Sequence, residues 1–218
     1  FKGTGAPQHP PKSLKDCCIA MEAPAQQVIG SEIQLVTLQR DDSQKVYEVA
    51  VLHYDGFGGK RCCLCFGDTT SELESSLKSA VKWVPDSKLE SYGLAIASDK
   101  VVGFAQLGFH DTPGDVMMPW CFRTRPNSDT CHLERIVVSS QMRGKGVGTQ
   151  LLDWVDAKAR ERNCKKVKLE VVSNNPAKKL YERQGYVSHT GSCQKVCLCP
   201  MTCCLMGHLY FDAMYKTL

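Results

Sequence analysis

Apolar residues recur along the chain with two different spacings, which predict strands and helices in mixed order. Seven stretches that alternate or are rich in β-branched residues predict strands: 33–37, 92–98, 101–109, 132–139, 167–171, a short one from 186, and 209–215. Apolar residues three or four positions apart predict helices: one through 46–51, one over 73–84 and one over 147–159. A fourth helix is predicted to begin at Asn175-Pro176 and to end at Gly185, a residue type suited to the position after a helix.

The regions between these elements predict how the chain is organised. Residues 1–30 are rich in Pro, Gly, Ala and Gln and lack a periodic apolar pattern, so we expect a poorly ordered lead-in. Residues 31–218 are expected to form one domain, with insertions near 110–130 and 190–208. Connections of about twenty residues are long for a compact domain and are often functional, so these insertions are candidates for substrate selection.

Composition narrows the class of protein. A hydrophobic content of 43% with 23% charged residues is typical of a globular domain, and no apolar run approaches the roughly 20 residues of a membrane-spanning helix. The thirteen cysteines include adjacent pairs, which rarely form disulfides with each other. We therefore expect mostly reduced thiols and a cytoplasmic protein, with no membrane partner.

Charge points to a small anionic ligand. The net charge of +4 is too mild to indicate nucleic-acid binding. Residues 143–183, however, contain eleven Lys or Arg against five Asp or Glu. A basic segment of this kind suits a phosphorylated cofactor.

A glycine-rich turn follows the strand that ends near Val138. Its sequence is Ser-Ser-Gln-Met-Arg-Gly-Lys-Gly-Val-Gly, and a helix begins at its end. The first amides of a helix lack intrahelical partners and the helix dipole favours anions there, so Gly144, Gly146 and Gly148, with Arg143 and Lys145, predict a phosphate site. The glycine spacing fits neither a Walker loop nor the dinucleotide fingerprint. A turn that needs glycine for its backbone alone would explain one or two of the three.

The motif Gln141-x-x-Gly144-x-Gly146 resembles the cofactor signature of the GCN5-related N-acetyltransferase (GNAT) family. Upstream, Leu133-x-x-Ile136-Val137-Val138 is in the register of that family. Downstream, Asn174-x-x-Ala177-x-x-Leu180-Tyr181-Glu182-x-x-Gly185-Tyr186 is similar to its second conserved stretch. The resemblance is close over residues 131–187 and elsewhere rests on the order of elements.

This resemblance implies a fold, a co-substrate and an activity. The fold is α/β: a mixed, mostly antiparallel sheet of about seven strands flanked by about four helices. The reaction is transfer of an acetyl group from acetyl-coenzyme A to a primary amine by direct attack in a ternary complex. The coenzyme A pyrophosphate would be held by the turn, the pantetheine arm would pair with the strand, and Asn174 would also contact the cofactor. The residues so implied are Ile136, Val137, Val138, Gln141, Arg143, Gly144, Lys145, Gly146, Val147, Gly148, Asn174 and Tyr181.

The resemblance also assigns chemical roles. Tyr181 would give a proton or hydrogen bond to the coenzyme A sulfur, and the Val138 amide would face the thioester carbonyl. The alternative for Tyr181 is a partly buried aromatic of an amphipathic helix. Glu134 is the candidate general base, expected to share a strand face with Ile136 and Val138, with His132 one step further as a second candidate. An exposed carboxylate paired with a lysine is the alternative for Glu134.

The cysteine-rich segment Cys193-x3-Cys197-x-Cys199-x3-Cys203-Cys204, with His208 nearby, departs from the family. Structural zinc sites usually have spaced Cys-x2–4-Cys pairs, so we expect no metal site here. Two other functions stay open: a coenzyme A-binding sensor without catalysis, and a cysteine-rich, metal-responsive interaction module. Asp111, Asp115 and Asp129 could attract an ammonium group or simply be solvated loop acids. The acceptor amine and the oligomeric state are left open by the sequence.

Overall fold

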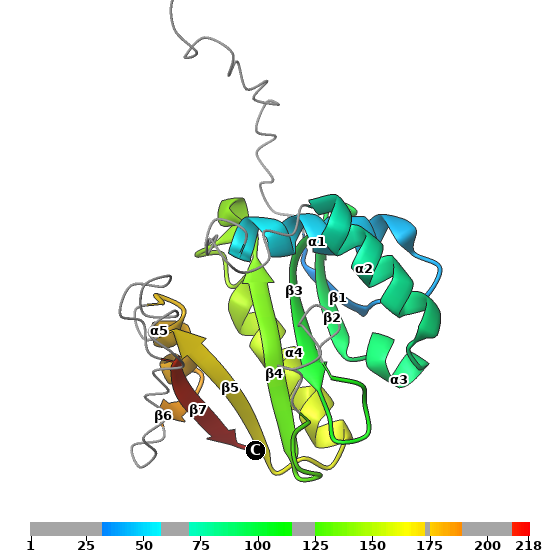
Figure 1. The fold of residues 1–218 in the computed structure, drawn as a ribbon. Coiled ribbons are helices and arrows are strands. Elements are labelled where there is room, and N and C mark those ends of the chain that lie inside the picture. The colour runs from blue at the N-terminus through cyan, green and yellow to red at the C-terminus, as the bar shows by residue number, and fades with distance from the viewer. Residues whose placement is uncertain (1–31, 58–69, 115–124, 173–174, 189–210) are drawn as a thin grey trace, which may run out of the picture. The chain divides into compact units, whose positions relative to one another are not determined.

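The computed structural model describes residues 32–57, 70–114, 125–172, 175–188 and 211–218 (Figure 1). All of them belong to one compact unit, Ser31–Leu218. Within them, seven strands form a single sheet: β1 (Gln34–Thr37), β2 (Tyr92–Ala97), β3 (Lys100–Gly108), β4 (Thr130–Val138), β5 (Lys166–Val172), β6 (Val187–Ser188) and β7 (Phe211–Thr217). Their order across the sheet is β1-β2-β3-β4-β5-β7-β6.

The sheet is mixed, as the family resemblance implies. Neighbouring strands are antiparallel except β4 and β5, which are parallel. The β2–β3 hairpin turns through Ser98 and Asp99, whose φ angles of 50° and 60° are those of a turn that matches the strand twist. The expected α/β fold is therefore confirmed.

Five α-helices flank the sheet, one more than expected among the residues that the structure describes: α1 (Ser43–Phe57), α2 (Thr70–Trp83), α3 (Asp86–Leu89), α4 (Val147–Glu161) and α5 (Lys178–Arg183). Asp42 caps α1, because its Oδ1 accepts a hydrogen bond from the Lys45 amide at 3.0 Å. The unexpected helix is α3, a single turn that follows Pro85 and is too short to produce a periodic apolar pattern.

Each face of the sheet has its own apolar core. On one face, buried residues of α4 such as Leu151 and Val155 pack with Cys131 and Leu133 of β4 and with Tyr181 of α5. On the other face, α1, α2 and α3 pack on Phe104 of β3 and Val137 of β4. We call these the α4 face and the α1 face.

A β-bulge interrupts β4 at Glu134. Gln106 of β3 pairs with Arg135 and Leu107 pairs with Leu133, so Glu134 is an extra residue without an opposite partner in β3. The inserted residue reverses the alternation of β4 side chains between the two faces of the sheet. Leu133 and Ile136 therefore both pack in the core of the α4 face. The expectation that Glu134 shares a face with Ile136 and Val138 is therefore wrong, and Glu134 lies on the α1 face with Gln106.

The two parallel strands separate soon after they meet. β4 and β5 pair at Thr130–Lys166, Cys131–Val167 and His132–Lys168, and the rest of β4 has no pairing with β5. Figure 1 shows the two strands diverging toward the C-terminal end of β4. Beyond His132, one edge of β4 therefore has no partner among the strands that the structure describes.

None of the described helices has both the length and the apolar character needed to cross a bilayer.

Candidate active site

The turn between β4 and α4 has the backbone that its glycines predict. A short 3-10 turn, Ser140–Met142, precedes Gly144 and Gly146, whose φ angles are 76° and 83°. This left-handed region costs other L-residues roughly 1–2 kcal/mol. A Cβ atom at either position would meet no atom within 4 Å, so both glycines face open space. The turn can therefore admit a bulky group directly against its backbone.

Donors gather at this open surface. Among the described residues, the amides of 143–146 form no backbone hydrogen bond, and α4 begins directly after them at Val147. The Arg143 Nε donates to the Val138 carbonyl at 3.3 Å, and Gln141 and Lys145 are exposed nearby. Val147 is buried, so its side chain belongs to the core and only its amide can serve a ligand. Free amides, a helix N-terminus and two cations suit a pyrophosphate.

The backbone of β4 alternates between its two neighbours. The Ser139 amide donates to the Val102 carbonyl of β3 at 2.9 Å, so the backbone groups of Val138 point away from β3. The same alternation directs Ile136 toward the unpaired edge and Val137 toward β3. Of the three β4 residues implied by the resemblance, Ile136 and Val138 can thus offer backbone hydrogen bonds to an extended ligand. Val137 instead buries its side chain in the α1-face core.

Tyr181 lies close to this turn. Its neighbour Leu180 meets the start of α4, where a Cβ at Gly148 would come within 2.9 Å of the Leu180 Cδ2. Tyr181 is buried against Tyr186, with ring centroids 5.9 Å apart in an edge-on arrangement. Burial raises the pKa of Tyr181 to about 12, so the hydroxyl stays protonated in neutral solution. Asn174 lies outside the described residues.

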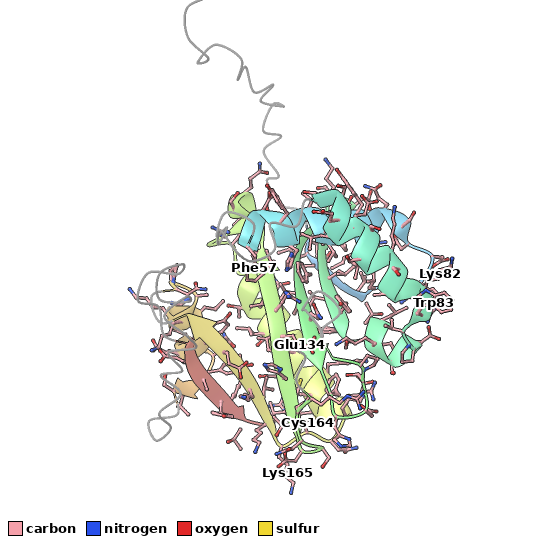
Figure 2. All side chains as sticks on the ribbon, in the orientation of Figure 1. Phe57, Lys82, Trp83, Glu134, Cys164 and Lys165 are labelled. Carbon is pink, nitrogen blue, oxygen red and sulfur yellow. The ribbon has the colours of Figure 1, made fainter. Side chains whose placement is uncertain are left out.

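Glu134 forms a buried ion pair. Its Oε2 lies 3.0 Å from the Nζ of Lys88 of α3 and 2.7 Å from the Nε2 of Gln106 (Figure 2 labels Glu134, midway along β4). The side chains of Lys88 and Glu134 are only 0% and 4% exposed. The pairing with a lysine was one of the two expectations for Glu134, but the pair is buried rather than exposed. Neither Lys88 nor Gln106 carries a local sequence signal that would have identified it.

His132 contacts a second carboxylate on the same face. Its Nε2 lies 2.6 Å from Oε2 of Glu170 on β5, and Oε1 of Glu170 lies 2.6 Å from Nζ of Lys168. Burial raises the pKa of Glu170, but hydrogen bonds and charge from His132 and Lys168 outweigh it and lower the pKa to about 2. Glu170 was not expected at the site, because its partner lies on another strand, 38 residues earlier in the chain.

Comparison with family models places residues 64–186 in the acetyltransferase (GNAT) family. This match spans more than half of the chain and contains both the turn and Tyr181. The chain belongs to the GNAT family. Acetyl-coenzyme A is the co-substrate typical of this family, and transfer of acyl groups is its family-level activity. A comparison of the sequence with curated proteins gives no match.

Solved structures share the GNAT fold at low sequence identity. The PaiA N-acetyltransferase of Thermoplasma acidophilum, in complex with coenzyme A, is 15% identical, with a TM-score of 0.51 over 86% of this chain and 99% of that one. A GNAT-family acetyltransferase of Streptococcus pneumoniae is 19% identical, with a TM-score of 0.55 over 86% and 99% of the two chains. A chain of the NatC complex bound to Gag peptide and coenzyme A is 15% identical, with a TM-score of 0.56 over 86% and 99%.

A cavity of about 440 Å³ borders the turn of this GNAT domain on the α1 face. It is lined by residues of α1, the end of β4 and the turn: Leu52, Asp55, Gly56, Val137, Val138, Ser139, Ser140 and Arg143. A larger hollow of about 700 Å³ lies along β1 and Trp154 and contains none of the site residues. Size alone would favour the larger hollow, but of these two only the smaller cavity borders the turn.

Other candidate residues of the GNAT domain have structural partners. Asp111 pairs with Arg162 at 3.0 Å, and Asp129 accepts a hydrogen bond from the Thr130 hydroxyl, which favours ordinary loop acids over an ammonium site. Asp115 and the cysteine-rich segment 193–208 lie outside the described residues. In the part of the chain that the structure describes, no three His, Cys, Asp or Glu side chains cluster as metal ligands.

Proposed function

We propose that this GNAT domain transfers the acetyl group of acetyl-coenzyme A to a primary amine by direct attack in a ternary complex. One observation carries the proposal: the unpaired edge of β4 leads into a turn of free amides at the N-terminus of α4. An extended arm could pair with that edge while its phosphates rest in the turn. Coenzyme A has this shape, with a diphosphate at one end of a chain that contains two amides.

In this proposal each part of the site has one task. The amides from Gln141 to Gly148, with Arg143 and Lys145, hold the pyrophosphate. The backbone groups of Ile136 and Val138 bond the pantetheine arm as an added strand would, so that the arm runs along the unpaired edge of β4 away from the turn. The acceptor approaches from the α1 face.

Tyr181 supplies the proton to the departing sulfur. Burial keeps its hydroxyl protonated, with a pKa raised to about 12, and α5 packs against the start of α4 beside the turn. Direct attack needs no covalent nucleophile. Cys131 and Cys164 are consistent with this, because both are buried thiols whose pKa burial raises further, and they are therefore poor nucleophiles at neutral pH.

An acceptor panel tests the proposal. The full chain would be incubated with acetyl-coenzyme A and, in separate reactions, a peptide α-amine, a lysine peptide, a polyamine and a small aromatic amine. Mass spectrometry of the acceptor and thiol release would report turnover. We expect an acetylated product with at least one amine class. Tight coenzyme A binding with no acetylated product from any class would instead favour the sensor function.

A further inference from the structure

The apex where β4 and β5 part carries a polar cluster. His132 and Lys168 form the last pair between the two strands, and Glu170 lies two residues further along β5. Their neighbours Cys131, Leu133, Val167 and Leu169 pack in the core of the α4 face, so these three polar side chains belong to the α1 face. This is also the face of the cavity beside Val138.

Glu170 is held by both of its oxygens. Oε2 contacts Nε2 of His132 and Oε1 contacts Nζ of Lys168, each at 2.6 Å. A carboxylate at Nε2 makes that nitrogen the donor, which leaves Nδ1 as the proton acceptor of the neutral ring. The arrangement is that of a histidine base oriented by an acid, with a lysine orienting the acid in turn.

Glu134, the other candidate base, is less suited to accept a proton. Its Oε2 already accepts from both Lys88 and Gln106, and its side chain is 4% exposed. Protonating it would leave the buried Lys88 ammonium without a counter-charge. His132, at 15% exposure, is both accessible and directed by Glu170.

We propose that His132 is the general base of the transferase and that Glu170 is its positioning residue. The inference rests on the proposed function. A coenzyme A arm that pairs with β4 from the turn runs toward the apex, which brings its thioester end toward His132. His132 then reaches the acceptor amine directly or through one water molecule.

The proton balance of the step is complete. The acceptor ammonium gives one proton to Nδ1 of His132, and its nitrogen bonds to the acetyl carbon as the carbon–sulfur bond breaks. The sulfur takes a proton from Tyr181, which recovers one from the same nitrogen as the amide forms. His132 returns its proton to water. Among the described residues, the charged groups on this face near His132 include Glu170 and Lys168 of β5 and the Glu134–Lys88 pair from β4 and α3.

The test compares four proteins with an acceptor that the wild type acetylates: wild type, His132→Gln, Glu170→Gln and the double variant. Glutamine retains hydrogen bonding to Glu170 but cannot take a proton. Glu161→Gln, which removes the exposed carboxylate of the Lys158–Glu161 pair on α4, is the matched control. The kcat is measured against pH at saturating substrates, and acetyl-coenzyme A affinity is measured by calorimetry.

We expect His132→Gln to lower kcat at neutral pH by roughly a hundredfold or more, with unchanged acetyl-coenzyme A affinity. The acid limb of its kcat profile should move to higher pH, toward the pKa of the amine itself. Glu170→Gln should lower kcat by about tenfold or more, and the double variant should be no slower than His132→Gln, because the two residues act as a unit.

An unshifted acid limb and near wild-type kcat in folded His132→Gln would overturn the role of His132 while leaving the transferase function intact. If His132→Gln does not fold, Glu170→Gln becomes the decisive variant. An unchanged kcat and an unchanged pH profile of kcat in Glu170→Gln would overturn the proposed roles of His132 and Glu170. Wild-type protein that binds acetyl-coenzyme A but acetylates no amine would contradict the proposed function and this role together.

Discussion

The Nζ of Lys88 lies 3.0 Å from the Oε2 of Glu134, and both side chains are buried. Lys88 also donates to the Leu107 carbonyl at 3.0 Å. Its ammonium group therefore joins α3 to β3 and to β4 at the bulge. The bulge decides which residues of β4 turn their backbone toward the unpaired edge. We infer that this ion pair stabilises β4 and its bulge rather than performing the chemistry.

Lys88→Met should therefore destabilise the protein strongly. Removing one partner of a buried ion pair leaves an uncompensated charge, which costs roughly 3–5 kcal/mol in the free energy of unfolding. Urea denaturation measures this change. The double variant Lys88→Met/Glu134→Gln should recover part of the loss, because it removes the isolated charge.

Lys158→Met is the control for this prediction. Lys158 pairs with Glu161, whose side chain is 63% exposed, and such surface pairs are worth about 1 kcal/mol or less. If Lys88→Met costs no more than Lys158→Met, the buried pair has no special structural role.

The main strands and helices and the glycine backbone of the turn after β4 could be predicted from the sequence, because they depend on local patterns. Alternation and helical periodicity marked the strands and the main helices, and three glycines beside Arg143 and Lys145 marked the turn. Gly144 and Gly146 have the left-handed φ angles that favour glycine, and cofactor binding at this turn stays a prediction.

The acid–base residues could not be assigned in the same way. The sequence from His132 to Val138 predicts a regular strand, and it contains no signal for the β-bulge at Glu134. From the sequence alone, Lys88 would be expected on the solvated surface. In the fold, α3 places it against Glu134 at the bulge. The partners Glu134–Lys88 and His132–Glu170 are 46 and 38 residues apart, so only the tertiary fold brings them together.

Tyr181→Phe should slow chemistry without weakening cofactor binding. The change keeps the ring and removes the hydroxyl, and losing a general acid lowers kcat by roughly ten- to a thousandfold. Because burial raises the pKa of Tyr181 to about 12, the hydroxyl is protonated at all ordinary pH values. The ratio of wild-type kcat to Tyr181→Phe kcat should therefore be the same from about pH 6 to pH 10 in steady-state kinetics.

Tyr186→Phe is the matched control for Tyr181→Phe. The Tyr186 hydroxyl is buried without a hydrogen-bond partner among the described residues, so its loss should leave kcat unchanged. An equal loss in both variants, or an unimpaired Tyr181→Phe when chemistry limits the rate, would remove Tyr181 from the mechanism.

Glu170 should contribute to the acid stability of the protein. Its pKa in the folded state is lowered to about 2, from an ordinary value of 4.5. A lowered pKa stabilises the fold at pH values above 4.5, and this contribution is lost as the pH falls toward about 2. Urea midpoints of wild type and Glu170→Gln should therefore differ at neutral pH and converge on acidification. A constant difference across that window would contradict the assigned pKa.

The cysteine-rich segment should not hold a stoichiometric metal. Its spacing lacks the paired cysteines of closed zinc sites, so we expect the purified protein to carry less than about one zinc per chain. Acetyl-coenzyme A binding should then be insensitive to a chelator. A full equivalent of zinc by elemental analysis, lost when Cys199 and Cys203 are replaced together, would make the segment a structural metal site.

Calorimetric titration of acetyl-coenzyme A into wild type and Gly146→Glu tests the central claim most directly. A side chain at Gly146 enters open space at the turn, so the carboxylate would occupy and repel the pyrophosphate position. Gly185→Ala is the control, because Gly185 has a similar φ of 86° but lies outside the turn. We predict tight binding by wild type and Gly185→Ala, and a Kd at least tenfold weaker, or about 1.4 kcal/mol, for folded Gly146→Glu. Equal affinity in all three proteins would contradict the assignment of the turn as the cofactor site.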